Sequence, residues 1–435
     1  MRQLSCVPVT PRFAPSARPS PGQSSRLVTA VTTSLATVLA LVLVVTPPAT
    51  GAPPTAAGAP PVKAYHQWTA PFEYHGPGRE VTEGDTNPPT IRIGILASLT
   101  GGGAIYGQAM REGADLALEE INRRGGVLGR PLELIYRDDR NDMGENGHQT
   151  VRLLFEDKVW AIIGSVHSGC THVAARITLK AETPQLTTVS TDPTVQMIGS
   201  PWMFRCLADD RSQGRAIADL VFARHGHRRV GLFQQRNRYG KMGGKTIAQI
   251  AENRGTPLIF KNFFVTDQKD FSEQVALLRQ ANPDAIIIWG LYTEAAGLVR
   301  AIRAAGLKMP IYGADGLVSP EFIRLAGEAA EGTIVTYPFD DTRNDPVTKR
   351  FIETFQKKYG KPPDSFAAHA YDAVYLMARA IERGGLNKAR IRDALAATRE
   401  FPGVTGPISF NEYNDDPREV IFARVEGGRF QPIKD

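Results

Sequence analysis

The sequence predicts an α/β fold in which parallel β-sheets are covered by helices, and three observations lead to this prediction. A strand, a glycine-rich turn and a helix follow one another at 91–131 with almost no spare residues. Strand-like and helix-like segments then alternate through most of the remaining chain. The chain has 435 residues, 42% of them hydrophobic and 22% charged, so it can fill two cores.

The first strand and the first helix each carry regularly spaced apolar residues, which can pack on one shared core. Ile91, Ile93, Ile95 and Ala97 alternate along the strand. The helical stripe that follows comprises Met110, Ala114, Ala117, Leu118 and Ile121. The three glycines between them cross the carboxyl end of the strand, where open α/β sheets bind ligands and where glycine allows close approach. A plain surface turn explains three glycines equally well.

The later strands are too numerous for one comfortable open sheet. They are expected at 132–136, 160–164, 185–189, 230–234, 259–263, 285–289, 311–313 and 334–337. The clearest helices between them are expected at 243–254 and 271–280. Two Rossmann-like lobes are therefore the natural division of the chain.

Charge gives no reason to expect a nucleic-acid partner. The formal net charge is +6, but the first 52 residues hold four arginines and no acid, so the remainder carries only +2. Lysines and arginines elsewhere are interspersed with acids, as on an ordinary solvated surface.

Residues 1–52 have the character of an export signal, which implies a periplasmic location. A basic stretch precedes an apolar run at 27–45, and prolines and small residues follow up to Ala52. We expect cleavage near Ala52, with Ala59 as a second candidate. The apolar run of 19 residues is also just long enough to span a bilayer, so a retained membrane anchor is the alternative.

Residues 53–88 are rich in proline, glycine and alanine, a composition typical of a tether. The tether also contains aromatic residues, which suggest that part of it lies against the domain surface: Tyr65, Trp68, Phe72 and Tyr74. Cys6 precedes the apolar run and is not placed to carry a lipid. The exported part then holds Cys170 and Cys206, which allow one disulfide at most.

The first candidate site is the junction 164–171, GSVHSGCT, between a buried strand and a helix that we expect to begin near Thr171. Such a junction points free backbone N–H groups and the positive end of the helix dipole into the cleft, beside the hydroxyls of Ser168 and Thr171. This arrangement suits an anion, although an ordinary helix cap explains Thr171 equally well. In the next junction, Asp192 and Pro193 are expected to form the turn that starts a helix.

Several motifs occur in an order and at distances that resemble the periplasmic substrate-binding proteins of the branched-chain amino acid and amide type, which feed ABC importers. The main ones are IGILASLTGGGAIYGQ, ALEEINRRGGVLGRPLELIYRDD and IIGSVHSGCTHVAA. The resemblance runs from about Ile91 to about Phe430 and implies the type I periplasmic binding protein fold. It also implies a monomeric, non-enzymatic receptor without catalytic residues, metal ion or cofactor. Its ligand would be a small polar molecule, a branched-chain amino acid or a related amide, and its partner an ABC-importer permease in the inner membrane.

In this family the chain crosses between its two lobes three times. We place the crossings near 207–211, 337–342 and 404–409. The first lobe would then comprise residues 89–208 and 339–405, and the second lobe residues 209–338 and 406–435.

The resemblance also implies which residues of the first lobe meet the ligand. Ser168, with Gly169 beside it, matches the position that holds the ligand's carboxylate. Val189, Ser190 and Thr191 match the residues that complete the contacts to the α-carboxylate and the α-amine.

From the second lobe, Tyr239 and Tyr292 match aromatic positions that close over the ligand, and Tyr106 in the first loop is a further aromatic candidate. Asp315 matches the acid that pairs with the ligand ammonium in amino-acid-binding members, although many relatives have glutamate there. A cap for the short helix near Pro320 is the alternative role for Asp315.

Three other motifs are set aside on their spacing. The run 239–246, YGKMGGKT, resembles a phosphate-binding P-loop but has tyrosine in place of the first glycine. The run 138–142, DDRND, lacks the spaced ligands of a calcium loop and is expected to cap a helix. A third cluster matches no zinc motif: His167, Cys170 and His172.

Two functions from different classes remain. One is a solute receptor that closes its lobes around a ligand and presents the closed form to a permease. The other is a sensory module of the same fold that signals to a membrane partner, and retention of residues 27–45 as an anchor would favour it. The export signal and the absence of a signalling domain after Phe430 favour the receptor.

Overall fold

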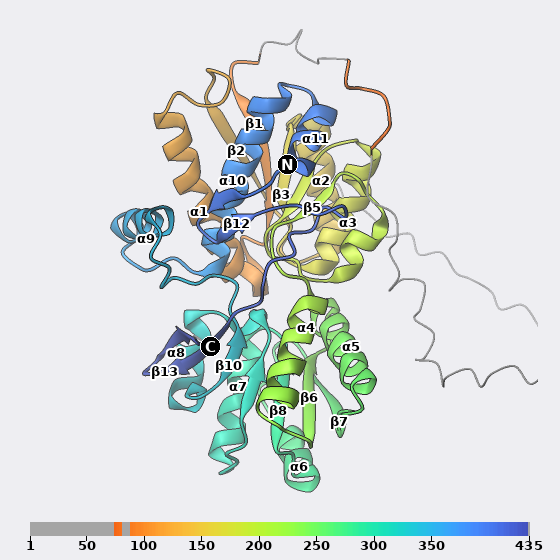
Figure 1. The fold of residues 1–435 in the computed structure, drawn as a ribbon, viewed down its shortest axis with the longest axis vertical. Coiled ribbons are helices and arrows are strands. Elements are labelled where there is room, and N and C mark those ends of the chain that lie inside the picture. The colour runs from red at the N-terminus through yellow and green to blue at the C-terminus, as the bar shows by residue number, and fades with distance from the viewer. Residues whose placement is uncertain (1–73, 81–87, 434–435) are drawn as a thin grey trace, which may run out of the picture. The chain divides into compact units, whose positions relative to one another are not determined.

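The computed structural model describes residues 74–80 and 88–433 (Figure 1). Its strands form two large sheets, each covered by helices, and most neighbouring strands are parallel. The predicted α/β fold with two Rossmann-like lobes is therefore confirmed.

The first lobe is built on a five-stranded parallel sheet of order β2-β1-β3-β4-β5. Its strands are β1 (Ile91–Ala97), β2 (Leu132–Asp138), β3 (Ala161–Gly164), β4 (Gln185–Thr187) and β5 (Met203–Arg205). Its helices are α1 (Ala104–Arg123), α2 (Met143–Val151), α3 (Ser168–Lys180), α9 (Pro346–Tyr359), α10 (Ser365–Gly384) and α11 (Lys388–Ala396). Shorter helical turns are η3 (Gly101–Gly103), η4 (Arg152–Glu156) and η5 (Pro193–Ile198).

Alternation along β1 sends its side chains into two different cores. Ile93 and Ile95 are buried with residues of α1 and α10. Leu96 points to the opposite face, where it packs with residues of η4 and α3. The stripe predicted for the first helix lies against the first of these cores, with Leu118 at its partly buried edge. Helices thus cover both faces of the sheet, as a parallel sheet requires.

The second lobe is built on a seven-stranded sheet of order β14-β13-β10-β9-β8-β6-β7, parallel except at β13 and β14. Its strands are β6 (Val230–Gln235), β7 (Phe260–Phe264), β8 (Ala285–Trp289), β9 (Ile311–Gly313), β10 (Ile334–Thr336), β13 (Phe422–Glu426) and β14 (Arg429–Pro432). Its helices are α4 (Asp210–Ala218), α5 (Arg238–Asn253), α6 (Ser272–Ala281), α7 (Tyr292–Ala304) and α8 (Pro320–Ala326). Shorter turns are η6 (Asp219–Arg224), η7 (Asp315–Leu317) and η8 (Gly327–Ala330).

The central strand β8 again divides its side chains between two cores. Ile286 and Ile288 are buried with residues of α6, α7 and α8, whereas Ile287 and Trp289 are buried with residues of α4 and α5. All eight strands expected after the first one are present, with ends within two residues of the expected ones. Five short strands were not anticipated: β5, β13, β14 and the antiparallel pair β11 (Phe401–Gly403) and β12 (Gly406–Ile408).

The third crossing lies later in the chain than expected. Strand β12 pairs with β11, and Phe410 is buried in the core of the first lobe. Asp415 then pairs with the fully buried Arg205, with 2.9 Å between Arg205 Nε and Asp415 Oδ1. A buried guanidinium needs a carboxylate partner, and this ion pair holds the segment against the first lobe. The expected boundary between residues 405 and 406 is therefore wrong, because the chain joins the second sheet only at β13.

Helices α1 and α10 approach each other closely at Gly113. A Cβ added there would lie 1.9 Å from the carbonyl oxygen of Ala367, so Gly113→Ala is expected to separate the two helices and to lower the free energy of unfolding by about 1–3 kcal/mol. Gly147→Ala in α2 is the control, because its Cβ would only touch Val173 at 3.4 Å. Alanine there is expected to leave stability unchanged or to raise it by up to about 1 kcal/mol. Urea denaturation of both variants tests the difference.

The expected export signal at 1–52, together with Tyr65, Trp68 and Phe72 of the tether, lies outside the described residues, as does Cys6. The described part of the tether, 74–80, packs on the first lobe: the Tyr74 and Trp202 rings are 4.8 Å apart, and Arg79 Nε lies 2.6 Å from Asp393 Oδ2. Part of the tether thus lies against the domain, as its aromatic residues suggested. Cys170 and Cys206 are both free in the described part of the chain, so no disulfide joins them to each other.

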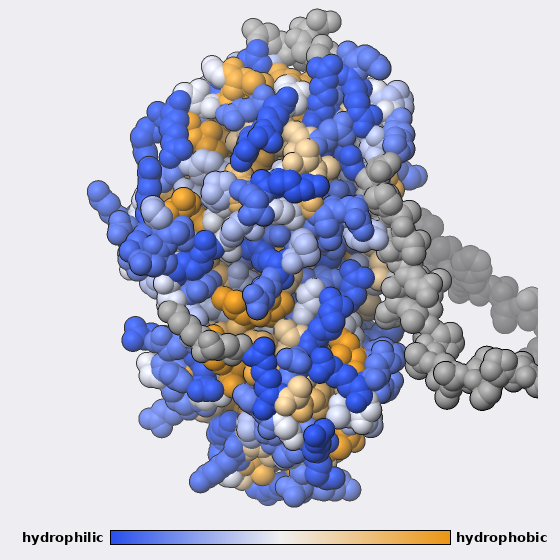
Figure 2. Space-filling model, in the orientation of Figure 1, coloured by the Kyte–Doolittle hydropathy of each residue, from blue (hydrophilic) through white to orange (hydrophobic). Residues whose placement is uncertain are grey.

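Hydrophilic side chains cover most of the face shown in Figure 2, with hydrophobic ones in small groups among them. Within residues 74–80 and 88–433, no helix combines the length and apolar character that crossing a bilayer would require.

Candidate ligand-binding site

The candidate site is a cleft between the carboxyl ends of the two parallel sheets. Loops after β1, β3 and β4 reach it from the first lobe, and loops after β6, β8 and β9 reach it from the second. It encloses a cavity of about 30 Å³, roughly the space of one water molecule. The lining residues are Tyr106, Val166, His167, Ser168, Val189, Tyr239, Leu291, Asp315, Gly316 and Phe366.

Five of the nine predicted site residues line this cavity: Tyr106, Ser168, Val189, Tyr239 and Asp315. The other four do not line it, although Gly169 follows Ser168 directly and Ser190 and Thr191 follow Val189. Tyr292 packs edge-on against Tyr106, with 5.3 Å between the ring centroids. The sequence did not single out Val166, Leu291, Gly316 or Phe366, since only their position in the fold brings them to the cleft.

The first lobe offers the open N-terminus of α3. The helix begins at Ser168, three residues earlier than expected, and no side chain caps it. Thr171 is therefore not its cap: the Thr171 hydroxyl donates to the carbonyl oxygens of Ser165 and His167, at 3.2 and 3.1 Å. With no capping side chain, the first N–H groups of the helix and its positive dipole end are left for an anion.

His167 lies beside this N-terminus as a neutral side chain. Burial lowers its pKa to about 4, against the raising effect of the Asp139 charge. Its Nε2 atom is buried without a hydrogen-bonding partner, and a Cβ on Gly103 would lie 2.2 Å from it. Glycine at this position therefore allows the first loop to approach His167.

The turn after β4 presents hydroxyl groups that the protein itself leaves unpaired. The Thr188, Ser190 and Thr191 side-chain oxygens are buried and have no hydrogen-bonding partner among residues 74–80 and 88–433. Asp192 begins η5, as expected of the Asp192-Pro193 turn, and accepts a hydrogen bond from Thr194 N at 2.8 Å. Buried hydroxyls are normally paired, so unpaired ones next to a cleft mark where ligand atoms can bond.

The second lobe offers a buried carboxylate, Asp315, which is 6% exposed. Tyr239 donates a hydrogen bond to Asp315 Oδ1 at 2.6 Å and accepts one from Gly316 N at 3.0 Å. Burial raises the pKa of Asp315 to about 6, although hydrogen bonds from Tyr239 and Gln213 oppose the shift. The alternative prediction, that Asp315 caps the helix starting at Pro320, is wrong. Ser319 caps that helix instead.

Tyr106 fills the centre of the closed cleft. Its hydroxyl donates to the carbonyl oxygen of Gly316 in the second lobe at 3.0 Å and accepts from Tyr292 N at 3.5 Å. Its ring packs against Phe366, with 4.7 Å between centroids. A ligand larger than water must therefore move this ring or enter while the lobes stand further apart.

A charged contact between the lobes closes the rim of the cleft. Arg238, the first residue of α5, reaches Asp192 of the first lobe with 2.6 Å between Nε and Oδ2. It also bonds Thr194 Oγ1 at 2.6 Å and His172 Nε2 at 2.8 Å. Burial alone would raise the pKa of Asp192, but His172, Arg238 and Thr194 together lower it to about 2. We call these four residues the rim latch; its pairing across the cleft left no signal in the sequence.

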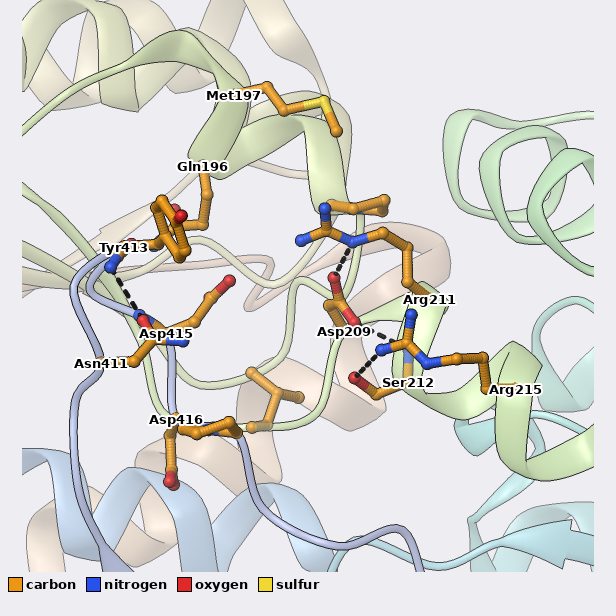
Figure 3. Close-up of a pocket in the computed structure, with 13 residues that line it drawn as sticks. Gln196, Met197, Asp209, Arg211, Ser212, Arg215, Asn411, Tyr413, Asp415 and Asp416 are labelled. Carbon is orange, nitrogen blue, oxygen red and sulfur yellow. Dashed lines mark hydrogen bonds and ion pairs between the residues drawn. The ribbon is translucent and has the colours of Figure 1, made fainter. Parts of the chain in front are cut away.

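A larger hollow of about 370 Å³ lies at the hinge (Figure 3) and contains none of the predicted site residues. Its charged residues are paired locally: Arg211 Nε lies 2.6 Å from Asp209 Oδ2, and Arg215 donates to the Ser212 hydroxyl at 3.3 Å. The cleft, with its unpaired carboxylate and hydroxyls, is therefore the better candidate for a ligand site.

The motifs set aside on spacing have structural roles. In the P-loop-like run, Gly243 and Gly244 lie within α5, where Cβ atoms would meet Trp289 at 2.0 Å and Gln234 at 1.7 Å. Asp142 caps α2 by accepting from Glu145 N at 2.7 Å. Burial raises the pKa of the Cys170 thiol. Among residues 74–80 and 88–433 no cluster of histidine, cysteine or acidic residues is arranged to hold a metal ion.

Two α/β lobes joined by three segments, with a cleft lined from both, define a bilobal binding protein. A family model for the periplasmic binding protein matches residues 90–429, and the chain belongs to this family. The resemblance noted in the sequence is thereby confirmed.

Three proteins that are similar to this chain are named for amino acids or were solved with one. A Pseudomonas aeruginosa protein named as binding leucine, isoleucine, valine, threonine and alanine is 28% identical over 327 residues, which cover 75% of this chain and 87% of the relative. The leucine-binding protein LivK of Thermotoga maritima is 32% identical, with a TM-score of 0.75 over 79% of this chain and 98% of LivK. LivJ of Streptococcus pneumoniae, solved with isoleucine, is 30% identical, with a TM-score of 0.75 over 80% of this chain and all of LivJ.

Proposed function

We propose that the protein is a periplasmic receptor for an L-amino acid, with a branched-chain amino acid as the first candidate. The observation that carries the proposal is a buried carboxylate, Asp315, which has no cationic partner among the described residues and lies in the same cleft as the uncapped N-terminus of α3. A free amino acid carries an ammonium and a carboxylate on one carbon. It can therefore bind Asp315 through the ammonium and the N-terminus of α3 through the carboxylate at the same time. The ligands named for LivK, LivJ and the Pseudomonas protein support the same choice.

The proposed binding mode places the ligand's carboxylate at the N-terminus of α3 and its ammonium at Asp315. Ser168 and Gly169 would receive the carboxylate, and Val189, Ser190 and Thr191 would contact both groups from the first lobe. Asp315 would pair with the ammonium, while Tyr106, Tyr239 and Tyr292 would close over the ligand. The apolar lining, which includes Val189, Leu291 and Phe366, suits an aliphatic side chain.

Binding to both lobes would couple ligand capture to closure, since a ligand that touches both lobes favours the closed form. The closed receptor would then be recognised by the permease of an ABC importer. We propose that it acts as a monomer, without catalysis, after export by residues 1–52.

Thermal unfolding against a panel of amino acids, amides, urea and aromatic acids tests this function. A ligand at a hundred times its dissociation constant adds about 2.7 kcal/mol to the stability. An upward shift with one or more aliphatic amino acids is expected. A shift only with urea, amides or aromatic acids would contradict the amino-acid proposal, as would no shift with any amino acid.

The rim latch is expected to slow ligand release. Arg238→Ala removes a contact made only when the lobes meet, so it is expected to weaken amino-acid binding by about tenfold, mainly through faster dissociation. The effect is modest because Arg238 is 41% exposed and its charge is screened. Arg236→Ala is the matched control, since Arg236 stacks on Phe263 of its own lobe. Stopped-flow dissociation rates that are equal for the two variants would exclude the latch.

A further inference from the structure

A second buried carboxylate lies beside the cleft. Asp210 is the first residue of α4, directly after the first crossing, and it is fully buried. Within the described residues, neither carboxylate oxygen makes a hydrogen bond of ordinary distance and angle, although the Thr191 hydroxyl lies near enough to lower the pKa. Its backbone N–H donates to Thr191 O at 2.8 Å, which holds Asp210 against the turn that carries the unpaired Ser190 and Thr191 hydroxyls.

Asp210 and Asp315 lie close enough to affect each other. Burial raises the pKa of Asp210 well above its ordinary range, the Thr191 hydroxyl lowers it, and the charges of Asp192, Asp315 and Asp209 raise it further. Both Asp315 and Asp210 also raise the pKa of Tyr239. One turn after Asp210 on α4, Gln213 Oε1 accepts from Asp315 N at 3.3 Å, which ties the start of this helix to the loop of Asp315.

The cations near Asp210 are engaged elsewhere. Arg205 bonds Asp415 through Nε and Nη2, both at 2.9 Å, and donates through Nη1 to Asp192 O at 2.9 Å. Arg238 pairs with Asp192 in the rim latch. Asp210 therefore has no cationic partner within the described part of the chain.

Asp210 also lacks the structural role of its neighbour. Asp209 caps α4 by accepting from Ser212 N at 2.8 Å and pairs with Arg211 at 2.6 Å. Asp210 makes no comparable bond through its side chain. An ionised carboxylate that is buried without a partner costs several kcal/mol, so Asp210 holds its proton in the empty cleft and ionises when a cation enters.

We propose that Asp210 is a second ammonium-binding residue of the site, so that the ligand's ammonium lies between Asp210 and Asp315 with the Thr191 hydroxyl beside it. This inference rests on the proposed function and sharpens it. Two carboxylates select ligands that carry an ammonium over amides, urea and carboxylic acids. They also make closure of the empty cleft less favourable than closure around an amine-bearing ligand.

Asp210→Asn tests the proposal, because it keeps the shape of the side chain and removes the charge. The probes are the twenty common amino acids and, for the tightest binder, the carboxylic acid that lacks only the amino group. The variant is expected to bind the amino acid about 10- to 100-fold more weakly and the carboxylic acid equally well, as expected for loss of one charged contact. Asp364→Asn is the control: burial raises the pKa of Asp364 to about 6, but it caps α10, and asparagine caps as well.

Each outcome decides between the two proposals. Binding by Asp210→Asn within twofold of wild type overturns the role of Asp210 alone, and so does an equal loss for both probes. No binding of any amino acid to the wild-type protein overturns the proposed function, and the inference with it.

A second measurement uses only the wild-type protein, in case the variant does not fold. Titration calorimetry at pH 6 in buffers of different ionisation enthalpy counts the protons released on binding. Asp315 alone, with a pKa of about 6, releases about half a proton per ligand at that pH. A larger release is expected if Asp210 also gives up its proton to the buffer as the ammonium binds, and a release of half a proton or less would overturn the inference.

Discussion

Asp315→Asn is expected to weaken amino-acid binding by about 30-fold or more, because removal of one partner of a buried charge pair costs about 2–5 kcal/mol. The loss should be specific for the ammonium. A ligand with the same side chain and carboxylate but no amino group should bind the variant as well as it binds the wild type. Dissociation constants from titration calorimetry for the two ligands test this, and an equal loss for both would remove Asp315 from the ammonium site.

The same variant is expected to be more stable than the wild type when no ligand is present. The pKa of Asp315 in the closed protein is about 6, against an ordinary value of 3.8. Below about pH 4 the side chain is protonated in both folded and unfolded chains and nothing is lost. As the pH rises from about 4 to about 6, the unfolded chain loses this proton while the folded protein keeps it, so the stability falls by about 3 kcal/mol for a difference of about two pKa units and levels off above pH 6.

Unliganded Asp315→Asn should therefore unfold at a higher temperature than the wild type at about pH 7.5, and the difference should shrink towards pH 4. Asp364→Asn should show the same trend in stability, since burial raises its pKa by a similar amount. It should leave ligand affinity unchanged, because Asp364 lies outside the cleft. If Asp315→Asn has the lower melting temperature at about pH 7.5, the carboxylate does not stand unpaired in a closed cleft.

Ser168→Ala is expected to weaken amino-acid binding by about 10- to 100-fold, the range for a lost hydrogen bond to a charged group. The hydroxyl stands at the uncapped start of α3, where the ligand's carboxylate is proposed to lie. Ser365→Ala is the matched control, because Ser365 is also buried and also opens a helix, α10, outside the cleft lining. Equal affinities of the two variants would show that the carboxylate binds elsewhere.

The parts of the fold that follow from local periodicity could be predicted from the sequence. Ile91–Ala97 alternates and the next helix carries an apolar stripe, so their packing follows from side-chain direction alone. The late third crossing could not be predicted in this way. It depends on the pairing of Arg205 with Asp415, two residues separated by most of the second lobe.

Some residues of the candidate site could also be predicted from the sequence, and others could not. Ser168 and Asp315 follow predicted strands, so they fall at the carboxyl ends of sheets where ligands bind. The rim latch and Asp210 had no such signal. Arg238 meets Asp192 only when the two lobes are folded against each other, and Asp210 differs from Asp209 only in lacking partners.

The central claim is that one cleft recognises the ammonium and the carboxylate of the same small molecule. Titration calorimetry of the purified protein with L-leucine, 4-methylpentanoate and 3-methylbutylamine tests this most directly, because the second ligand lacks the ammonium and the third lacks the carboxylate. Leucine is expected to bind, and each analogue is expected to bind at least about 100-fold more weakly, the effect of about 3 kcal/mol per lost charged contact. An analogue that binds within tenfold of leucine, or failure of leucine itself to bind, would contradict the account.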